Sequence, residues 1–210
     1  MVPLLHFSDR LTLKDFDSLP NSFVMKSNHG SAHVVIVKDL ASESLLDLVD
    51  KGNKWLSEDH YEFTKEKQYK SIPRKIIFEE LLSDDNGNVP EDYKFHCFKG
   101  EVEFIHVDAG RFVNHTRNFY DLDWNLLEFE WSPFKKGKSK YPNGPIDSKP
   151  ENLEEMILIA KKLSKSFDYV RIDLFNIGGK IYFGEITLHH ESGWGRFSPV
   201  FYDKKYGSLL

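Results

Sequence analysis

The sequence predicts an α+β protein built from antiparallel hairpins with a few covering helices. The strongest indication is a pair of strand-like segments, residues 169–175 and 181–187, separated by a glycine turn. A second pair, residues 93–98 and 102–108, is separated by a Lys-Gly turn and is most simply another antiparallel hairpin. An amphipathic helix pattern over residues 152–163 provides an element that can cover such a sheet.

The composition is that of a soluble globular protein. The chain has 210 residues, of which 40% are hydrophobic and 29% charged, and its formal net charge is -5. This negative charge argues against a nucleic-acid partner. The single cysteine, Cys97, excludes an intrachain disulfide and fits a reducing compartment. No apolar run approaches the roughly 20 residues of a membrane span, and the start lacks the features of a signal peptide, so we expect a cytoplasmic protein.

The first part of the chain is expected to form strands around a loop of small residues. Strands are predicted at residues 22–26 and 33–37, with the loop at residues 27–32 between them. A helix is expected from Ser42, its N-cap, with an apolar stripe formed by Leu45, Leu46, Val49 and Leu56. The pattern over residues 75–82 predicts a further strand.

The second part contains the two hairpins and the clearest helix. A connector is expected at residues 83–90 and an additional strand within residues 111–120. The helix over residues 152–163 should begin at Asn152, which resembles a capping box with Glu155. Its predicted apolar face consists of Leu153, Met156, Ile157, Ala160 and Leu163.

Prolines and glycines mark residues 131–150, for which we expect an ordered surface loop without regular structure. A basic run lies within it, formed by Lys135, Lys136, Lys138 and Lys140. Such a run is more often a solvated loop than a binding site. A contact with phosphate or polysaccharide is the alternative.

Asp173 and Glu185 each lie in the middle of an apolar, strand-like segment, where charges are normally avoided. If both point inward they need a shared cation, and carboxylate oxygens suit Mg²⁺ or Ca²⁺. The alternative is that both acids face solvent.

The register of this hairpin decides whether the two acids share a face, because side chains alternate along a strand. A two-residue turn would set Asp173 opposite Gly184 and put Glu185 on the wrong face. A three-residue loop or a glycine bulge would set Asp173 opposite Phe183, with Glu185 diagonal to it. We therefore predict an odd-length or bulged turn.

The remaining side chains of the hairpin then fall into two sets. Arg171, Thr187 and His189 would share the face of the two acids, and Val170, Ile172, Leu174 and Ile186 would form the core side.

Lys26 at a strand end, followed by Asn28, His29, Gly30 and Ser31, offers a cation beside a loop able to aim backbone N–H groups at phosphate oxygens. In order along the chain come this loop, residues 77–82, Arg171-x-Asp173 and Glu185-x-Thr187. This order resembles the nucleotide site of the ATP-grasp superfamily. The segments at residues 26–31, 92–100, 115–121, 170–174 and 195–199 look most like the teichuronopeptide-biosynthesis, or TupA-like, group.

The resemblance implies an ATP-grasp fold, in which two α+β subdomains with antiparallel sheets grip a nucleotide. Residues 1–82 would form an N-terminal segment and a glycine-loop lid subdomain, and residues 83–210 a C-terminal subdomain that binds metal and nucleotide. Members of the family carry an N-terminal domain before the lid, whereas only about twenty residues precede Phe23 here. The N-terminal domain is thus expected to be short or missing.

The resemblance also implies roles for individual residues, with ATP and Mg²⁺ as cofactors. Lys26 would contact the α- and β-phosphates under a lid containing Gly30 and Ser31. The remaining nucleotide contacts would be Glu79, Glu80 and Leu82 beside adenine, Asp92 at the ribose, and Lys94, His115 and Arg117 near phosphate or acceptor.

The implied metal ligands are Asp173, Glu185 and Thr187, and Arg171 would stabilise charge on the transferred phosphoryl group. Thr187 departs from the family, which commonly has Asn at this position. A hydroxyl is a poorer Mg²⁺ ligand than an amide oxygen.

The function implied is an ATP-dependent carboxylate–amine ligase that acts through an acyl phosphate in cell-surface polysaccharide or peptide-polymer biosynthesis. Its partners would be ATP and a small carboxylate or amine, with an acidic polysaccharide precursor as a candidate. Two alternatives stay open: a glycosyltransferase in polysaccharide biosynthesis, and a non-catalytic nucleotide-binding remnant of the fold.

Overall fold

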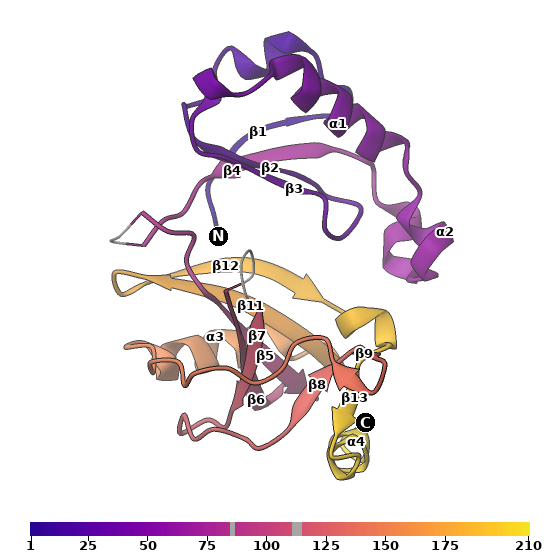
Figure 1. The fold of residues 1–210 in the computed structure, drawn as a ribbon, viewed down its shortest axis with the longest axis vertical. Helices are drawn as coiled ribbons and strands as arrows, with labels where there is room; N and C mark the ends of the chain where they lie inside the picture. The colour runs from indigo at the N-terminus through magenta and orange to yellow at the C-terminus, as the bar shows by residue number, and fades with distance from the viewer. Residues whose placement is uncertain (85–86, 111–114) are drawn as a thin grey trace. The chain divides into compact units, whose positions relative to one another are not determined.

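The computed structural model describes residues 1–84, 87–110 and 115–210, and the chain forms two compact units, Val2–Ser83 and Asp84–Leu210 (Figure 1). Each unit has its own antiparallel sheet and its own covering helix.

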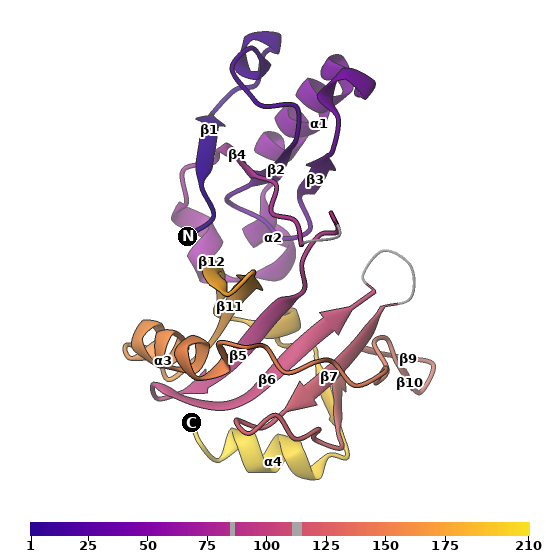
Figure 2. The same ribbon diagram turned by 90° about the vertical axis from the view of Figure 1, so that its left-hand side faces the viewer.

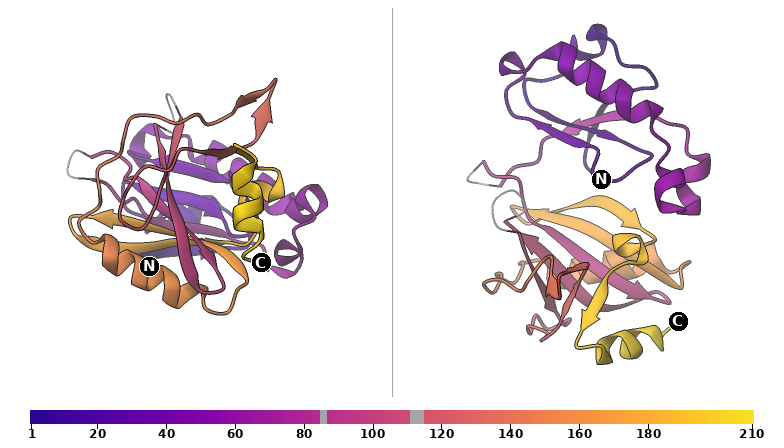
Figure 3. Two further views of the ribbon diagram at one scale, coloured as in Figure 1. Left: turned by 90° about the horizontal axis from the view of Figure 1, so that it is seen from below. Right: turned by 45° about the vertical axis from the view of Figure 1, so that its right-hand side comes forward.

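The first unit is built on a four-stranded sheet in the order β1-β4-β2-β3. Its strands are β1 (Leu4–Ser8), β2 (Phe23–Ser27), β3 (Val34–Val37) and β4 (Ile76–Glu80). Helix α1 (Leu45–Ser57) packs on one face of the sheet, as Figure 3 shows, and α2 (His60–Thr64) follows it. Short 3₁₀ segments lie at Leu13–Phe16, Leu40–Ser42 and Lys67–Ser71. Aromatic and aliphatic side chains with 0% exposure fill the space beneath the helix, among them Phe23, Met25, Ile76 and Phe78.

The strands expected in this part are confirmed, but the start of the helix was placed too early. Ser42 ends a 3₁₀ turn, and the N-cap of α1 is Ser44, whose hydroxyl accepts a hydrogen bond from the Asp47 amide at 3.3 Å. Gly52 lies inside the helix. A side chain there would collide with Leu11, because a Cβ atom would lie 2.3 Å from the Leu11 Cδ1 atom. The helix therefore uses a glycine for close packing.

The second unit is built on a five-stranded sheet in the order β12-β11-β5-β6-β7 (Figure 2). Its strands are β5 (Asp92–Phe98), β6 (Glu101–Ala109), β7 (Thr116–Tyr120), β11 (Tyr169–Ile177) and β12 (Lys180–Thr187). Smaller strands are β8 (Glu130–Ser132), β9 (Phe134–Lys135), β10 (Lys138–Ser139) and β13 (Arg196–Ser198). The helices are α3 (Leu153–Ser164), a 3₁₀ turn at His190–Gly193, and α4 (Phe201–Gly207).

The two faces of the five-stranded sheet differ in chemistry. One face packs against α3 through side chains with 0–1% exposure that include Val170, Ile172, Leu174, Leu153 and Met156. The opposite face carries charged and histidine side chains, bordered by an aromatic cluster that includes Phe104, Phe119 and Phe129. The polar face of the sheet is therefore the candidate location of the functional site.

Several predictions for this unit need correction. Asn152 precedes α3 but makes no side-chain cap hydrogen bond, because its amide donates to the Gly179 carbonyl instead. Leu163 is 37% exposed, and the helix buries Ser164 in its place. Ile186 is 41% exposed because β12 is an edge strand, so the core side of the hairpin comes mainly from β11.

The segment at residues 131–150 contains more regular structure than expected. Strands β9 and β10 pair as a hairpin, and β8 pairs with β13. The strand expected within residues 111–120 is confirmed at Thr116–Tyr120, and residues 111–114 lie outside the described residues. Across the described chain, no helix combines the length and the apolarity that a membrane crossing requires.

Candidate active site

Asp173 on β11 lies directly opposite Glu185 on β12. The connecting turn has two residues, Gly178 and Gly179, with φ values of 54° and 74°, so the predicted odd-length turn does not form, and the glycine bulge expected as the alternative lies outside the turn. The register shifts farther along the ladder, where Gly184 is the extra residue between the Asp173–Glu185 and Leu174–Phe183 pairs. The acids share a face, as expected, but they are directly opposite rather than diagonal.

Gly184 is suited to this bulge because the backbone passes close to its neighbours. A Cβ at this position would lie 3.1 Å from the Asp173 carbonyl oxygen and 3.1 Å from the Phe175 ring. The bulge thus sets the pairing of the two acids.

Arg171 joins the two acids. Its Nε and Nη2 atoms donate to Asp173 Oδ1 and Oδ2, both at 2.7 Å, and Nη2 also donates to Glu185 Oε1 at 2.9 Å. The Thr187 hydroxyl donates to the same Glu185 oxygen at 3.1 Å. Burial raises the pKa of Asp173 to about 6, against the opposing effect of Arg171 and Lys94. Arg171 therefore acts as the resident cation of this carboxylate pair.

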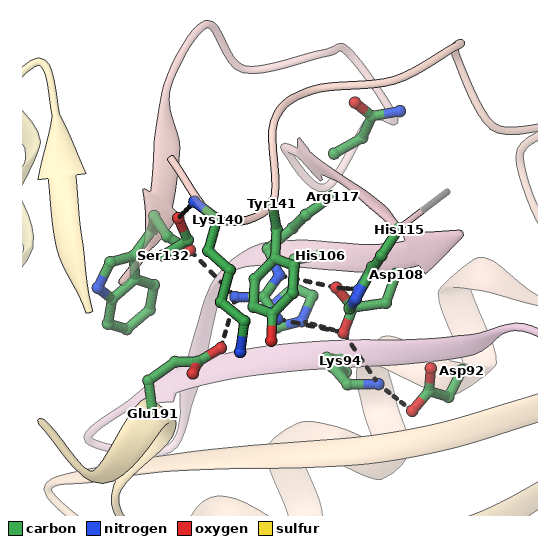
Figure 4. Close-up of polar contacts among 12 residues, drawn as sticks. Asp92, Lys94, His106, Asp108, His115, Arg117, Ser132, Lys140, Tyr141 and Glu191 are labelled. Atoms are coloured by element: carbon green, nitrogen blue, oxygen red, sulfur yellow. Dashed lines mark hydrogen bonds and ion pairs between the residues drawn. The ribbon is translucent and has the colours of Figure 1, made fainter. Parts of the chain in front are cut away.

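Lys94 lies among three carboxylates on the same face, two of which, Asp92 and Asp108, are drawn in Figure 4. Its ammonium forms an ion pair with Asp92 and lies 3.8 Å from Asp108 Oδ2 and 3.6 Å from Asp173 Oδ2. The side chains of Lys94, Asp108 and Asp173 are each only 4% exposed. Such burial is tolerated because each charge has opposite charges as neighbours.

A second arginine continues this arrangement onto β7 (Figure 4). Arg117 Nε donates to Asp108 Oδ1 at 2.7 Å, and Nη1 donates to Glu191 Oε1 at 3.0 Å. His115 Nε2 lies 2.9 Å from the same Asp108 oxygen. Burial alone would raise the pKa of Asp108, but His106, His115 and Arg117 outweigh it and hold the pKa well below its usual range.

Three buried histidines lie between the two arginines. His96 Nε2 and His106 Nδ1 share a hydrogen bond of 2.7 Å, and His96 Nδ1 is 2.9 Å from the Tyr169 hydroxyl. His190 Nδ1 is 2.9 Å from Arg171 Nη1. Because arginine can only donate, His190 Nδ1 accepts this hydrogen bond. Burial, reinforced by the nearby arginines, holds the pKa of all three imidazoles well below its usual range, so they are neutral at pH 7.

We call these residues the polar cluster: Asp92, Lys94, Asp108, Arg117, Arg171, Asp173, Glu185 and Glu191. It contains five carboxylates and three basic groups. Glu185, at 62% side-chain exposure, gives the cluster access to solvent. Across the described residues, no three His, Cys, Asp or Glu side chains are grouped to hold an ion, because Arg171 lies between the acids.

The first unit holds the other predicted residues. Lys26 Nζ on β2 lies 2.6 Å from Glu79 Oε2 on β4, so the predicted phosphate-binding lysine and adenine-side acid form an ion pair. The Glu80 amide donates to the Pro3 carbonyl at 3.0 Å, and Leu82 follows the end of the strand.

The loop between β2 and β3 contains Gly30 and Ser31 and is fixed at both ends. The Asn28 side chain accepts from the Lys75 amide at 2.8 Å and donates to the Pro73 carbonyl at 3.0 Å. His33 Nδ1 is 2.9 Å from the Ser27 hydroxyl, and its Nε2 is 3.0 Å from Glu58 Oε2. The loop is thus held on the segment that precedes β4 and on the C-cap residue of α1.

Sequence reasoning missed Asp108, Glu191 and the buried histidines. Part of the signal was present: Asp92-x-Lys94-x-His96 and His106-x-Asp108 alternate polar with apolar residues on paired strands. The contacts of Glu191 depend on the turn after β12 and have no such signal.

The comparisons with known proteins decide the family. The TupA-like ATP-grasp family matches the chain over residues 1–210. The chain belongs to this family. Its ATP-grasp fold accounts for two α+β units with antiparallel sheets. No curated protein matches the sequence.

Solved ATP-grasp structures are similar to this TupA-like chain at low identity. The D-alanine–D-alanine ligase from Bacillus anthracis complexed with ATP has 14% identity and a TM-score of 0.45, with 89% of this chain and 48% of that chain covered. The ATP-grasp ligase PsnB complexed with a minimal precursor, Mg and ADP has 12% identity and a TM-score of 0.43, with 89% and 45% covered. The chain therefore spans about half the length of these structures.

Proposed function

We propose that this chain is an ATP-dependent carboxylate–amine ligase that acts through an acyl phosphate in the biosynthesis of a cell-surface polysaccharide or peptide polymer. The observation that carries the proposal is the pairing of Asp173 with Glu185 beside Arg171, in a chain of the ATP-grasp family. Two carboxylates and an arginine on one face suit a reaction that transfers a phosphoryl group.

Asp173, Glu185 and Thr187 are the residues proposed to hold Mg²⁺. The carboxylate and hydroxyl oxygens of these side chains are donors that suit a hard dication. When bound, the ion would neutralise charge on the β- and γ-phosphates of ATP. Arg171 contacts His190 through Nη1, a nitrogen that neither acid uses, and this contact would orient the guanidinium toward charge on the transferred group.

The remaining predicted residues would bind the nucleotide. Lys26 with the loop of Gly30 and Ser31 would contact phosphates, and a phosphate would replace Glu79 as the partner of this lysine. The proposed contacts of adenine, ribose and phosphate are Glu79, Glu80, Leu82, Asp92 and Lys94.

The proposed reaction needs no nucleophilic side chain. A substrate carboxylate attacks the γ-phosphate and ADP leaves; an amine then attacks the acyl carbon, forming the amide bond and releasing phosphate. The chain's contribution is orientation and charge neutralisation. The proposed partners are ATP and a small carboxylate or amine, with an acidic polysaccharide precursor as a candidate, and the proposed location is the cytoplasm.

Isothermal titration calorimetry with Mg-ATP tests this proposal. We expect binding in about the micromolar range that requires Mg²⁺ and is lost in Asp173→Asn and Lys26→Ala. Lys51→Ala, an exposed lysine on α1, is the control and should bind normally. Absence of heat with folded wild-type protein would contradict the proposal. Binding without ADP release for any carboxylate and amine pair would favour the non-catalytic alternative.

A further inference from the structure

The basic run forms a defined β-hairpin rather than an irregular loop. Lys135 on β9 pairs with Lys138 on β10, and the two-residue turn between them has φ values of 52° at Lys136 and 76° at Gly137. Positive φ at both central positions is what a type I′ turn requires.

Two features of this hairpin oppose its stability. Lys136 occupies a left-handed conformation that disfavours a side chain and is usually taken by Asn, Asp or Gly. Lys135 and Lys138 place like charges directly opposite each other. Positions where a sequence breaks local rules without a compensating contact are commonly functional.

Among the described residues, no Asp or Glu side chain forms an ion pair that would offset the repulsion between the hairpin lysines. Lys135, Lys136, Lys138 and Lys140 are all exposed, and none forms an ion pair there. Elsewhere, lysines such as Lys26 and Lys161 pair with Glu79 and Glu101 at 2.6 Å. The hairpin is thus a concentrated positive charge on a chain whose net charge is -5.

The base of the hairpin is held firmly. The Ser132 and Ser139 hydroxyls are 2.6 Å apart, and the Lys140 amide donates to the Pro133 carbonyl at 2.9 Å. Lys140 Nζ lies 4.8 Å from the Tyr141 ring centroid, and the Arg117 guanidinium lies 4.6 Å from the same centroid (Figure 4). The charges are therefore presented on an ordered backbone beside the polar cluster, which lowers the ordering cost of binding.

We propose that the β9–β10 hairpin is a docking surface for an extended acidic peptide. Lys138 lies in β10 and Lys140 directly follows the strand, where its amide continues the pairing by donating to the Pro133 carbonyl, so we expect a strand-like separation of about 6.6 Å between the two Cα atoms. An extended peptide with acids at alternate positions repeats at the same distance. Lys135 is the cross-strand partner of Lys138 and adds a second cation beside it.

The docked peptide serves as substrate only if the proposed ligase function holds, whereas docking itself needs no nucleotide. The probe is a fluorescein-labelled twelve-residue peptide of alternating Glu and Ala. Its binding is measured by fluorescence anisotropy, without ATP, at about 50 mM and 300 mM salt. A triple variant, Lys135→Gln/Lys138→Gln/Lys140→Gln, removes the charges. The matched control, Lys162→Gln/Lys165→Gln/Lys204→Gln, makes the same charge change at exposed lysines of α3, its C-terminal end and α4.

We expect saturable binding to the wild type that weakens at the higher salt, with dissociation constants raised about tenfold in the hairpin variant and less than about twofold in the control. Circular dichroism and thermal melting confirm that both variants are folded. Absence of binding, or equal weakening in both variants, overturns the proposal. Preferential binding of an oligogalacturonide of equal charge through the same lysines overturns the assignment to a peptide. A chain that binds the peptide yet releases no ADP keeps the docking surface and loses the ligase function.

Discussion

Arg171 forms two parallel hydrogen bonds with Asp173, from Nε to Oδ1 and from Nη2 to Oδ2, both at 2.7 Å. This is the fork geometry in which arginine binds carboxylates most strongly. The same Nη2 atom donates to Glu185, so one guanidinium contacts both acids that are proposed to bind metal. An arriving cation must therefore compete with Arg171 for these oxygens.

Arg171→Gln is expected to destabilise the protein and to increase its response to Mg²⁺. Removing the arginine leaves the Asp173 carboxylate buried, with the more distant Lys94 as its cationic partner among the described residues, which should lower the free energy of unfolding by about 3 kcal/mol. Urea unfolding followed by tryptophan fluorescence, with and without about 10 mM Mg²⁺, measures both effects.

In the variant, Mg²⁺ should restore more stability than it adds to the wild type. Arg196→Gln, an exposed arginine on β13, is the control and should behave like wild type. An identical Mg²⁺ effect in wild type and Arg171→Gln would show that the arginine and the ion do not compete.

Lowering the pH should destabilise the second unit, because the folded unit keeps the imidazoles of His96, His106 and His190 neutral. The pKa of each is below its unfolded value near 6.5, so the unfolded chain binds more protons as the pH falls below 6.5 and stability is lost. Each histidine contributes about 1.4 kcal/mol between pH 7.5 and 5.5. Asp173 opposes this by less than 1 kcal/mol, because its raised pKa of about 6 favours the folded state as it gains a proton.

The net expectation is a loss of about 3 kcal/mol between pH 7.5 and 5.5. The Trp131 ring lies 4.4 Å from the His190 ring, so tryptophan fluorescence during urea unfolding reports on this region. His106→Asn should reduce this loss by about 1.4 kcal/mol, which is a little under half of it. Constant stability over this range would mean that the imidazoles take up protons without unfolding.

The sequence predicted the strands and their faces well because both depend on local alternation. Val170, Ile172 and Leu174 are buried against α3, and Asp173 and Glu185 share the other face, as their positions indicated. The bulge at Gly184 could not be assigned, because the glycine turn alone gives an even loop and the extra residue lies five positions beyond it.

The contacts of Arg117 with Asp108 and Glu191 also could not be predicted from the sequence. Asp108 on β6 is the direct cross-strand partner of Arg117 on β7, a pairing that depends on the strand register. Glu191 reaches Arg117 from a turn 74 residues later, so the residue spacing alone predicts neither contact. The hairpin at β9 and β10 was missed because Lys136 occupies a position at which sequence rules expect Asn or Gly.

Gly184→Ala is expected to disturb the pairing of the acids. The new methyl group would press on the Asp173 carbonyl and the Phe175 ring at 3.1 Å, and relief requires movement of the ladder. We expect a loss of about 1–3 kcal/mol in the free energy of unfolding and weaker Mg²⁺ binding by calorimetry.

The matched control is Gly207→Ala at the end of α4, where a Cβ meets nothing within 4 Å. This change should be neutral or slightly stabilising. Wild-type stability and Mg²⁺ binding in Gly184→Ala would show that the bulge tolerates a side chain and does not set the site.

Lys136→Asn separates stability from binding at the hairpin. Asn adopts the left-handed conformation more readily than Lys and forms the Asn-Gly pair that type I′ turns favour, so the free energy of unfolding should rise by about 0.5 kcal/mol. The same change removes one of four exposed positive charges, so affinity for the acidic peptide should fall about two- to threefold at low salt. Lys136→Gln, which removes the charge without favouring the turn, should show the weaker binding without the gain in stability. If Lys136→Asn lowers stability, the turn does not have the geometry described here; if it binds the peptide as wild type does, Lys136 lies outside the docking surface.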